Sequence, residues 1–481
     1  MIPLTLAEIA QVTGGRLHNA TGDETITGSV EFDSRKVTPG GLFIAVPGAR
    51  VDGHDFAAAA IRDGAAGVLA AREVDAPAVI VPPVEVAYGG AYALAGDKDG
   101  SGAAVLAGLA ALARAVVDRL PNLTVVGVTG SSGKTSTKDL ISQVLEPLGP
   151  TVAPPGSFNN ELGHPWTVLR SDESTRHLVL EMSARGPGHI RALCEIAPPN
   201  IGVVLNVGSA HLGEFGSREG IAQAKGELAE AATDVVVLNA DDPLVKGMAG
   251  RAKSRVVFVG EGQDVRAEDV QLDEQARATF RLVTPRGTAT VSLGLHGAHH
   301  VGNALSAAAV ALELGATPED IARSLSTAQR RSARRMEVTT RADGLTIVND
   351  SYNANPESMA AALRTLARMA GPDHERRTWA VLGVMAELGD NHADAHEEIG
   401  RLTARLGVDR LVVVGEQAGA IQHGARLEGM RTGEEPVLVP DVEAAVALLD
   451  TELRPEDVVL VKASNALGLW RVVDGLLGSR A

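Results

Sequence analysis

The chain has 481 residues, enough for two to four domains that each bury a core. Its 45% hydrophobic and 22% charged residues are typical of a globular protein in water. A net charge of −16 argues against general nucleic-acid binding, which needs a basic surface, although a local basic pocket can still hold an anionic substrate.

Targeting and redox features predict a cytoplasmic protein. The single cysteine, Cys194, excludes an internal disulfide and fits a reducing compartment. Residues 1–8 contain neither the basic nor the apolar segment of an export signal. The longest apolar stretch, residues 103–117, is interrupted by Arg114 and is short for a bilayer span. We therefore expect no membrane insertion.

The first part of the chain is predicted to be a small α/β domain. Thr5 and Glu8 have the spacing of a capping box at the start of a short helix. An alanine-rich helix is expected over residues 103–119, and Leu120-Pro121-Asn122 follows it as a natural boundary. The predicted domain is 1–122.

From residue 123 the pattern changes to apolar runs separated by helical segments, which indicates a parallel sheet covered on both faces. The predicted strands are Val125–Val128, Leu178–Leu180, Ile201–Leu205, Val235–Leu238 and Val256–Val259. Residues 279–295 break the pattern and predict an antiparallel hairpin, which two helices and a basic linker, Arg330–Arg335, follow. The predicted domain is 123–332.

The rest of the chain, 333–481, repeats the alternation and predicts a Rossmann-like α/β domain. Its predicted strands are Leu345–Val348, Trp379–Val384, Leu411–Val414, Val437–Val439 and Val458–Val461. The fold class expected for the whole chain is therefore α/β, in three domains.

A phosphate-binding turn is the strongest chemical signal. The apolar strand that ends at Val128 is followed by a turn of small residues, Gly130–Gly133, and by Lys134-Thr135 at the start of a helix. Such a turn presents backbone N–H groups and a helix N-terminus to phosphates, while Lys and Thr reach the terminal phosphates and Mg²⁺. The loop is shorter than the usual pattern, and a turn that uses glycine only for geometry is the alternative.

Two more polar residues follow predicted strands of the central sheet. Glu181 comes directly after the strand that ends at Leu180, and His211 lies in a turn past the strand that begins at Ile201. The carboxyl ends of parallel strands share one edge, so a carboxylate, an imidazole and the Thr135 hydroxyl could hold Mg²⁺ there. A single loop histidine is more often exposed or a capping residue.

Lys225 lies on the apolar stripe of its predicted helix, four residues after Ile221 and three before Leu228. By spacing alone, the favoured interpretation is a lysine that extends its ammonium group to water. The alternative is a partly buried lysine with a lowered pKa, whose neutral amine can form a carbamate with CO₂ or act as a base.

Several motifs together resemble the Mur ligase family, whose members build the peptide of peptidoglycan. The motifs that carry the resemblance are Thr129–Thr135, Asn206 with His211, Phe215–Ser217, Ala222–Glu227 and Arg334–Glu337. Two more, Asp350–Pro356 and Val381–Gly389, indicate a member that adds a dipeptide. The resemblance runs from Asp33 to Ser464, which is nearly the whole chain.

The resemblance implies an ATP-dependent, amide-forming ligase with two Mg²⁺ ions and a carbamylated Lys225. The implied ATP-binding residues are Thr129, Gly130, Ser131, Ser132, Gly133, Lys134, Thr135, Asn303, Arg335 and Asp350. The implied metal ligands are Thr135, Glu181, His211 and Lys225. The implied catalytic residues are Lys134, Asn160, His211, Lys225 and Arg335.

The implied substrates are a UDP-N-acetylmuramoyl-tripeptide (UDP-MurNAc-tripeptide) and D-alanyl-D-alanine (D-Ala-D-Ala), bound by a monomer. The implied substrate-binding residues are Ser34, Arg35, Asn159, Asn160, Tyr352, Asn353 and Asn355, with Gly53-His54 near the UDP group. Two positions depart from the family pattern: Asn465 replaces an expected arginine, and Glu181–Arg185 lacks a common glycine.

Three other functions stay open at this point. One is a sister ligase that adds a single amino acid, and a second is a folylpolyglutamate synthase, which shares the ATP motifs. The third is a nucleotide-binding switch, scaffold or inactive paralogue without ligase chemistry. The motif Asp350–Pro356 argues against the first two.

Overall fold

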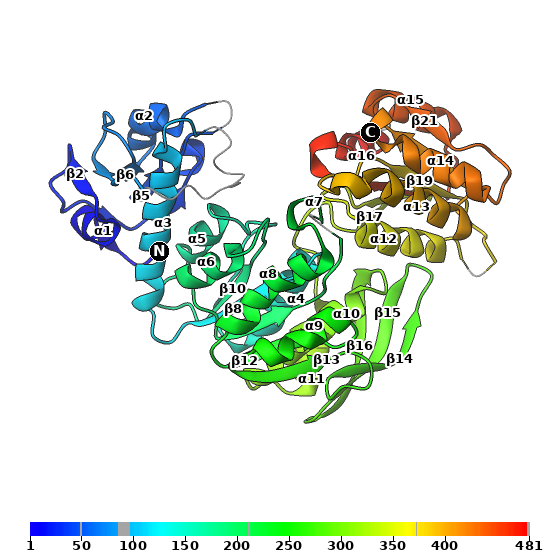
Figure 1. The fold of residues 1–481 in the computed structure, drawn as a ribbon, viewed down its shortest axis with the longest axis horizontal. Coiled ribbons are helices and arrows are strands. Elements are labelled where there is room, and N and C mark those ends of the chain that lie inside the picture. The colour runs from blue at the N-terminus through cyan, green and yellow to red at the C-terminus, as the bar shows by residue number, and fades with distance from the viewer. Residues whose placement is uncertain (49–50, 85–96, 210–211, 372, 479–481) are drawn as a thin grey trace.

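The structure is a computed structural model that describes residues 1–48, 51–84, 97–209, 212–371 and 373–478. It is α/β throughout, as the sequence predicts. Figure 1 shows an N-terminal part beside a central part, and a C-terminal part beyond the central one. Each part is built around its own main sheet.

The N-terminal part contains a five-stranded sheet in the order β2-β7-β6-β5-β4. Its strands are parallel except β2, which runs antiparallel to β7. Its elements are β1 (Leu4–Thr5), α1 (Leu6–Thr13), β2 (Arg16–His18), β3 (Thr25–Ile26), β4 (Val30–Glu31), β5 (Gly41–Ile44), α2 (Ala57–Arg62), β6 (Ala65–Ala70), β7 (Ala78–Ile80) and α3 (Ser101–Asp118). The predicted capping box of α1 is confirmed, because Thr5 and Glu8 exchange hydrogen bonds between side chain and backbone.

Helix α3 connects the first two parts. By length and composition its 18 residues could cross a membrane, contrary to the sequence estimate, but 56% of that window is buried inside the protein. One core contains residues of α3, such as Leu109 and Leu112, together with Val125 of the central sheet and Ile9 of α1. Helix α3 therefore packs as a core helix that attaches the N-terminal part to the central one.

The central part contains a six-stranded, all-parallel sheet in the order β13-β12-β11-β8-β10-β9. Its strands are β8 (Thr124–Thr129), β9 (Thr151–Val152), β10 (His177–Glu181), β11 (Ile201–Val204), β12 (Val235–Asn239) and β13 (Arg255–Val259). Its helices are α4 (Lys134–Leu145), α5 (Gly163–Val168), α6 (His189–Ile196), α7 (Leu212–Phe215), α8 (Arg218–Ala231) and α9 (Pro243–Gly247). Two apolar clusters cover its two faces, so the predicted buried parallel sheet is confirmed.

A three-stranded antiparallel sheet, β14-β15-β16, extends the central part and is followed by two helices. Its elements are β14 (Arg266–Leu272), β15 (Arg277–Thr284), β16 (Gly287–His296), α10 (His300–Glu313) and α11 (Pro318–Thr327). The predicted hairpin corresponds to β15 and β16. The adjoining strand β14 is not predicted, because its sequence, with Arg266, Glu268 and Asp269, has no alternating apolar pattern.

The C-terminal part contains a six-stranded sheet in the order β17-β18-β22-β19-β20-β21, parallel except for β17. Its strands are β17 (Glu337–Thr340), β18 (Thr346–Asn349), β19 (Thr378–Leu382), β20 (Arg410–Val414), β21 (Val437–Val439) and β22 (Val458–Lys462). Its helices are α12 (Pro356–Met369), α13 (His392–Arg405), α14 (Gly419–Glu428), α15 (Val442–Glu452) and α16 (Trp470–Gly478). Separate apolar clusters cover the two faces of this doubly wound sheet.

The carboxyl ends of the central and C-terminal sheets face a common cavity of about 420 Å³. The central sheet contributes residues that follow β8, β10 and β11, and the C-terminal sheet contributes residues at the ends of β18 and β22. In open parallel sheets, ligands bind outside the carboxyl ends of the strands. The fold therefore places one large polar site between two sheets.

Candidate active site

The turn between β8 and α4 has the geometry of a phosphate-binding loop. Gly133 has a φ of +81°, and a Cβ atom there would lie 2.9 Å from Asn303 Oδ1, so glycine is required twice over. The backbone N–H groups of Ser131 and Ser132 both donate to Asn206 Oδ1, at 3.0 and 2.9 Å. Asn206, just past β11, thus holds the turn in shape beside the cavity.

Lys134 begins α4 and folds back over the turn. Its Nζ donates a 2.7 Å hydrogen bond to the carbonyl of Gly130, four residues earlier. Burial lowers the pKa of Lys134, while the Glu181 carboxylate opposes that change and Arg335 adds to it. A lysine held this way at a helix N-terminus is placed to meet an oxyanion.

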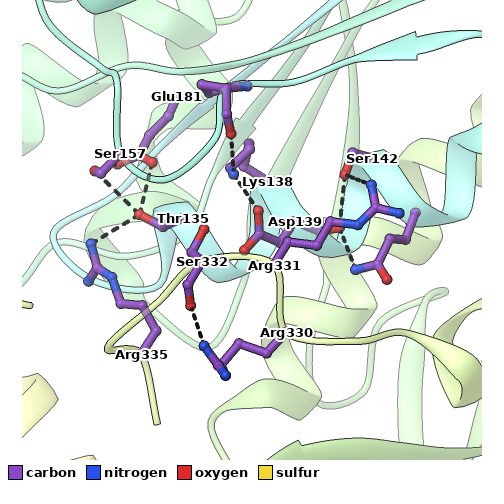
Figure 2. Close-up of polar contacts among 12 residues, drawn as sticks. Thr135, Lys138, Asp139, Ser142, Ser157, Glu181, Arg330, Arg331, Ser332 and Arg335 are labelled. Carbon is purple, nitrogen blue, oxygen red and sulfur yellow. Dashed lines mark hydrogen bonds and ion pairs between the residues drawn. The ribbon is translucent and has the colours of Figure 1, made fainter. Parts of the chain in front are cut away.

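Glu181 ends β10 and is buried beside the phosphate turn (Figure 2). Thr135 Oγ1 donates to its Oε2 at 2.9 Å, and Ser157 Oγ donates to its Oε1 at 2.9 Å. Asn159 Nδ2 also donates to Oε1, at 2.6 Å. Two hydroxyls and a carboxylate form the oxygen-rich donor set that Mg²⁺ prefers, so these residues fit a magnesium ion.

The structure describes no group of three or more His, Cys, Asp or Glu side chains that could hold a metal; His211 itself lies outside the described residues. The donor set near Glu181 therefore rests on one carboxylate and hydroxyl groups. This is typical of Mg²⁺ sites that complete their shell with water and substrate phosphates.

Lys225, on α8, is only 5% exposed, so the interpretation that its head reaches water is wrong. Within the part of the chain that the structure describes, no residue forms a hydrogen bond or ion pair with it. Burial and then the charge of Lys134 lower the pKa of Lys225 well below its ordinary value. A neutral amine close to the phosphate turn is therefore favoured.

Arg335 crosses from the start of the C-terminal part to the phosphate turn. Its Nη2 donates to Thr135 Oγ1 at 3.1 Å, and its guanidinium stacks on Tyr352 at 4.2 Å from the ring centre. Its Nε is buried and has no hydrogen-bond partner in the described structure, which indicates a donor directed toward a ligand.

Asp350, one residue past β18, lies on the C-terminal side of the cavity. Its Oδ1 accepts from the backbone N–H of Met336, and its Oδ2 pairs with Lys462 Nζ at 2.6 Å. Lys462 ends β22, is almost fully buried and also donates to the carbonyl of Asn353. The pair thus holds the Asp350 loop against the end of β22.

The three asparagines predicted around this cavity all line it. Asn303 lies in the first turn of α10, and its Nδ2 is 3.3 Å from His300 Nδ1. Asn355 caps the N-terminus of α12, and its Nδ2 reaches the carbonyl of Ser131 at 3.4 Å. Asn353 is exposed between them in sequence, so its side chain is available to a substrate.

Several predicted residues lie elsewhere. Thr129 and Gly130 do not line the cavity, and Thr129 Oγ1 instead joins β8 to the carbonyl of Met182. Asn160 is also outside it, because its Oδ1 accepts from the N–H of Gly163 at the start of α5. These three residues shape the walls rather than face the cavity.

The residues predicted to touch UDP are in the N-terminal part, outside the cavity. Ser34 and Arg35 form a short 3-10 turn, and the Arg35 side chain is 85% exposed. The hydrogen bond from Arg35 lowers the pKa of Asp33 to about 2. His54 is buried, with Nδ1 on Asp52 and Nε2 accepting from Ala71, so its ring nitrogens are already used within the protein.

Sequence reasoning missed functional roles for Ser157 and Lys462. Ser157 lies in a loop whose only signal is its position two residues before Asn159. Lys462 carries a clearer signal, because it directly follows a predicted strand and so belongs at the ligand-binding edge of the sheet.

Comparison with known families identifies the class of protein. The family model of the Mur ligase middle domain matches residues 128–311, and that of the Mur ligase glutamate ligase domain matches 334–465. A third, the catalytic domain of the Mur ligase family, matches 27–114. The chain belongs to the Mur ligase family.

Curated relatives narrow the similarity to one kind of member. A Mycobacterium tuberculosis protein, strain H37Rv, is 57% identical over 99% of this chain and 98% of its own length. An Escherichia coli K12 protein is 32% identical over 99% of both chains. Both are named UDP-N-acetylmuramoyl-tripeptide–D-alanyl-D-alanine ligase.

Solved structures give the same picture. A crystal structure of MurF from Acinetobacter baumannii superposes with a TM-score of 0.84, at 31% identity and 99% coverage of both chains. MurF ligase from Thermotoga maritima in complex with ADP superposes at 0.76, at 32% identity, over 95% of this chain and 99% of that chain.

Proposed function

We propose that this chain joins D-Ala-D-Ala to a UDP-MurNAc-tripeptide, with ATP as the energy source, and so forms the pentapeptide precursor of peptidoglycan. The observation that carries the proposal is the cavity shared by the phosphate turn and the C-terminal sheet, in which Arg335 reaches Thr135 at 3.1 Å. The two curated relatives described above are named for this reaction.

The chemistry requires an activated acyl group, because a carboxylate does not condense with an amine in water. In the proposed first step, an oxygen of the tripeptide carboxylate attacks the γ-phosphorus of ATP and ADP leaves, which gives an acyl phosphate. In the second, the amine of D-Ala-D-Ala attacks the acyl carbon and loses a proton. The tetrahedral intermediate then expels phosphate and leaves the amide.

Lys134 and Arg335 are the residues that stabilise the charge of the transferring phosphoryl group. Lys134 sits on the phosphate turn, and Arg335 carries a buried, unpaired Nε beside Thr135. Fixed cations in a site that excludes water stabilise such a transition state strongly. Asn303, which lines the cavity at the start of α10, is placed to contact adenine.

Thr135, Ser157 and Glu181 are the oxygen ligands that we propose for Mg²⁺, which neutralises phosphate charge when bound. His211 and a carbamate on Lys225 are proposed for a second ion. The support for the carbamate is the burial of Lys225 and its lowered pKa, which favour a neutral amine able to react with CO₂.

The acceptor is proposed to lie along Tyr352, Asn353 and Asn355, and the UDP group near Ser34 and Arg35. The stacking of Arg335 on Tyr352 supports an acceptor site next to the phosphate site. Asn159 hydrogen-bonds Glu181 and is placed beside the acyl phosphate, whereas Asn160 acts by shaping the loop.

The proposed domain limits are 1–122, 123–332 and 333–481. Their support is that each family match falls inside one of these ranges. We also propose a cytoplasmic monomer, in line with the acidic composition and the single buried cysteine, Cys194.

An acceptor screen tests the proposed specificity. With ATP, Mg²⁺ and the UDP-tripeptide, we expect D-Ala-D-Ala to form a pentapeptide product and single amino acids to form none. Product with a single amino acid only would show a sister ligase instead. ATP binding without any amide product would show a non-catalytic paralogue.

A further inference from the structure

One cation in the cavity has no role in the phosphate chemistry described above. The cationic side chains that line the described part of the cavity are Lys134, Arg185, Arg335 and Lys462. Lys134 and Arg335 contact the phosphate-turn region, and Lys462 is paired with Asp350. Arg185 lies four residues past the end of β10, so it enters the cavity from the central sheet at a different point.

Arg185 pairs across the two parts of the protein with Glu387. Its Nη2 is 3.3 Å from Glu387 Oε1, and both side chains are partly in water, at 32% and 38% exposure. An ion pair whose two ends are hydrated adds little to stability. A second carboxylate in the cavity can therefore replace Glu387 at little cost to the fold.

The turn that carries Glu387 is held in an unusual conformation. Glu387 has a φ of +65°, which is uncommon for a residue with a side chain and is costly unless the surroundings enforce it. Two residues later the chain is packed tightly, since a Cβ on Gly389 would lie 2.8 Å from the Cα of Gly213. Contact with the central part thus fixes the turn and presents Glu387 to Arg185.

The C-terminal wall offers little else to an incoming carboxylate. In its described part, Asn353 and Asn465 are uncharged, and Lys462 is already engaged with Asp350. An acceptor dipeptide brings its own terminal carboxylate into this region, next to ATP and a second substrate that are also anionic. A cation must balance that charge, and Arg185 is the one that is available across the cavity.

We propose that Arg185 binds the terminal carboxylate of the acceptor dipeptide, which takes the place of Glu387. The inference rests on the proposed function and adds to it a specificity-determining residue on the central sheet. A guanidinium can form two parallel hydrogen bonds to one carboxylate, a geometry that lysine cannot supply. Dipeptides with a free carboxyl end are then preferred over neutral analogues.

A cycle of two enzymes and two acceptors tests this directly. The wild-type protein and R185A are assayed with D-Ala-D-Ala and with D-alanyl-D-alaninamide, whose end is uncharged, at saturating ATP and UDP-tripeptide. One charge-assisted hydrogen-bonded pair should give the wild-type a preference for the free acid of about 10- to 100-fold in kcat/KM. In R185A that preference should fall to about threefold or less, through a higher KM for the acid, with the amide little affected.

The outcomes separate the inference from the proposed function. A wild-type enzyme that makes no amide bond with D-Ala-D-Ala contradicts the proposed function itself. A wild-type preference that R185A retains, or a rise in the KM of the UDP-tripeptide instead, contradicts the assignment of Arg185 to the acceptor. Turnover of the amide by R185A shows that the variant is folded.

Two further variants sharpen the test. R191A removes an arginine on α6 that is 60% exposed and outside the cavity, and it should keep the full preference. E387Q removes the competing negative charge and should lower the KM for D-Ala-D-Ala about two- to fivefold. An unchanged or higher KM in E387Q contradicts the exchange of Glu387 for the substrate.

Discussion

The hydroxyl of Thr135 donates a 2.9 Å hydrogen bond to the carboxylate of Glu181, although 46 residues separate them in the chain. One residue opens the helix after β8 and the other ends the neighbouring strand β10. The contact follows from the parallel pairing of the two strands, which brings both carboxyl ends to one edge. It joins the phosphate turn to the proposed metal ligands.

Replacing Glu181 with Gln should raise the Mg²⁺ concentration that gives half-maximal activity. The amide keeps the size of the side chain but removes the charge that holds the ion, and we expect a shift of about tenfold or more. The measurement is activity against Mg²⁺ concentration for E181Q and for E195Q, an exposed control on α6. The same Mg²⁺ dependence in E181Q and wild-type would remove Glu181 from the metal site.

Lys134→Ala should reduce ligation by about 10²- to 10³-fold, because a fixed cation at the transferring phosphate is lost. The measurement is kcat for product formation at saturating substrates. K246A, which removes an exposed lysine on α9, is the matched control and should keep full activity. Full activity in K134A would contradict the assignment of the turn to ATP phosphates.

The carbamate on Lys225 predicts a dependence on CO₂. Burial lowers the pKa of this lysine, so its neutral amine is available near neutral pH and is lost as the pH falls and the amine is protonated. Enzyme freed of CO₂ should lose activity, recover it on addition of bicarbonate, and recover it less well at lower pH. K225A should be inactive with or without bicarbonate. Activity of the wild-type that is independent of bicarbonate would contradict the carbamate.

His396 predicts an acid-dependent loss of stability. The ring is fully buried, its Nε2 accepts from the N–H of Met385, and its Nδ1 donates to the carbonyl of His392. Burial lowers its pKa to about 4, against about 6.5 in an unfolded chain. The folded state therefore keeps its full stability above pH 6.5 and loses about 3 kcal/mol from this residue as the pH falls to 4.

The check is the difference in thermal midpoint between wild-type and H396Q over pH 4 to 7. The wild-type midpoint should fall more steeply on acidification, so the two curves converge toward pH 4. H423Q, which changes a histidine with 63% side-chain exposure, should follow the wild-type curve. Parallel curves for wild-type and H396Q would show that His396 stays neutral in both states.

The main strands could be predicted from the sequence because they are buried on both faces. Val235–Leu238 lies within β12, and Val437–Val439 coincides with β21. The missed strands have other compositions: β17 is largely polar and half exposed, and β6 is rich in alanine, which also favours helix. Their positions depend on the neighbouring strands that they pair with, which local patterns do not specify.

The candidate site could be predicted where its residues directly follow predicted strands or begin helices. Lys134, Thr135 and Glu181 are examples, and all three line the cavity. Partners that come from distant loops could not be predicted, such as Asn206, which binds the phosphate turn from 74 residues away. Asn160 shows the opposite error, since a local helix start uses the side chain that a motif assigns to catalysis.

The most direct test of the account is phosphate release from ATP with Mg²⁺, with UDP-MurNAc-tripeptide and D-Ala-D-Ala added separately and together. The account predicts that rapid release requires both substrates and that mass spectrometry finds the UDP-pentapeptide in equal amount. Release that neither substrate increases, in a protein that binds ATP, would contradict ligase function for this chain.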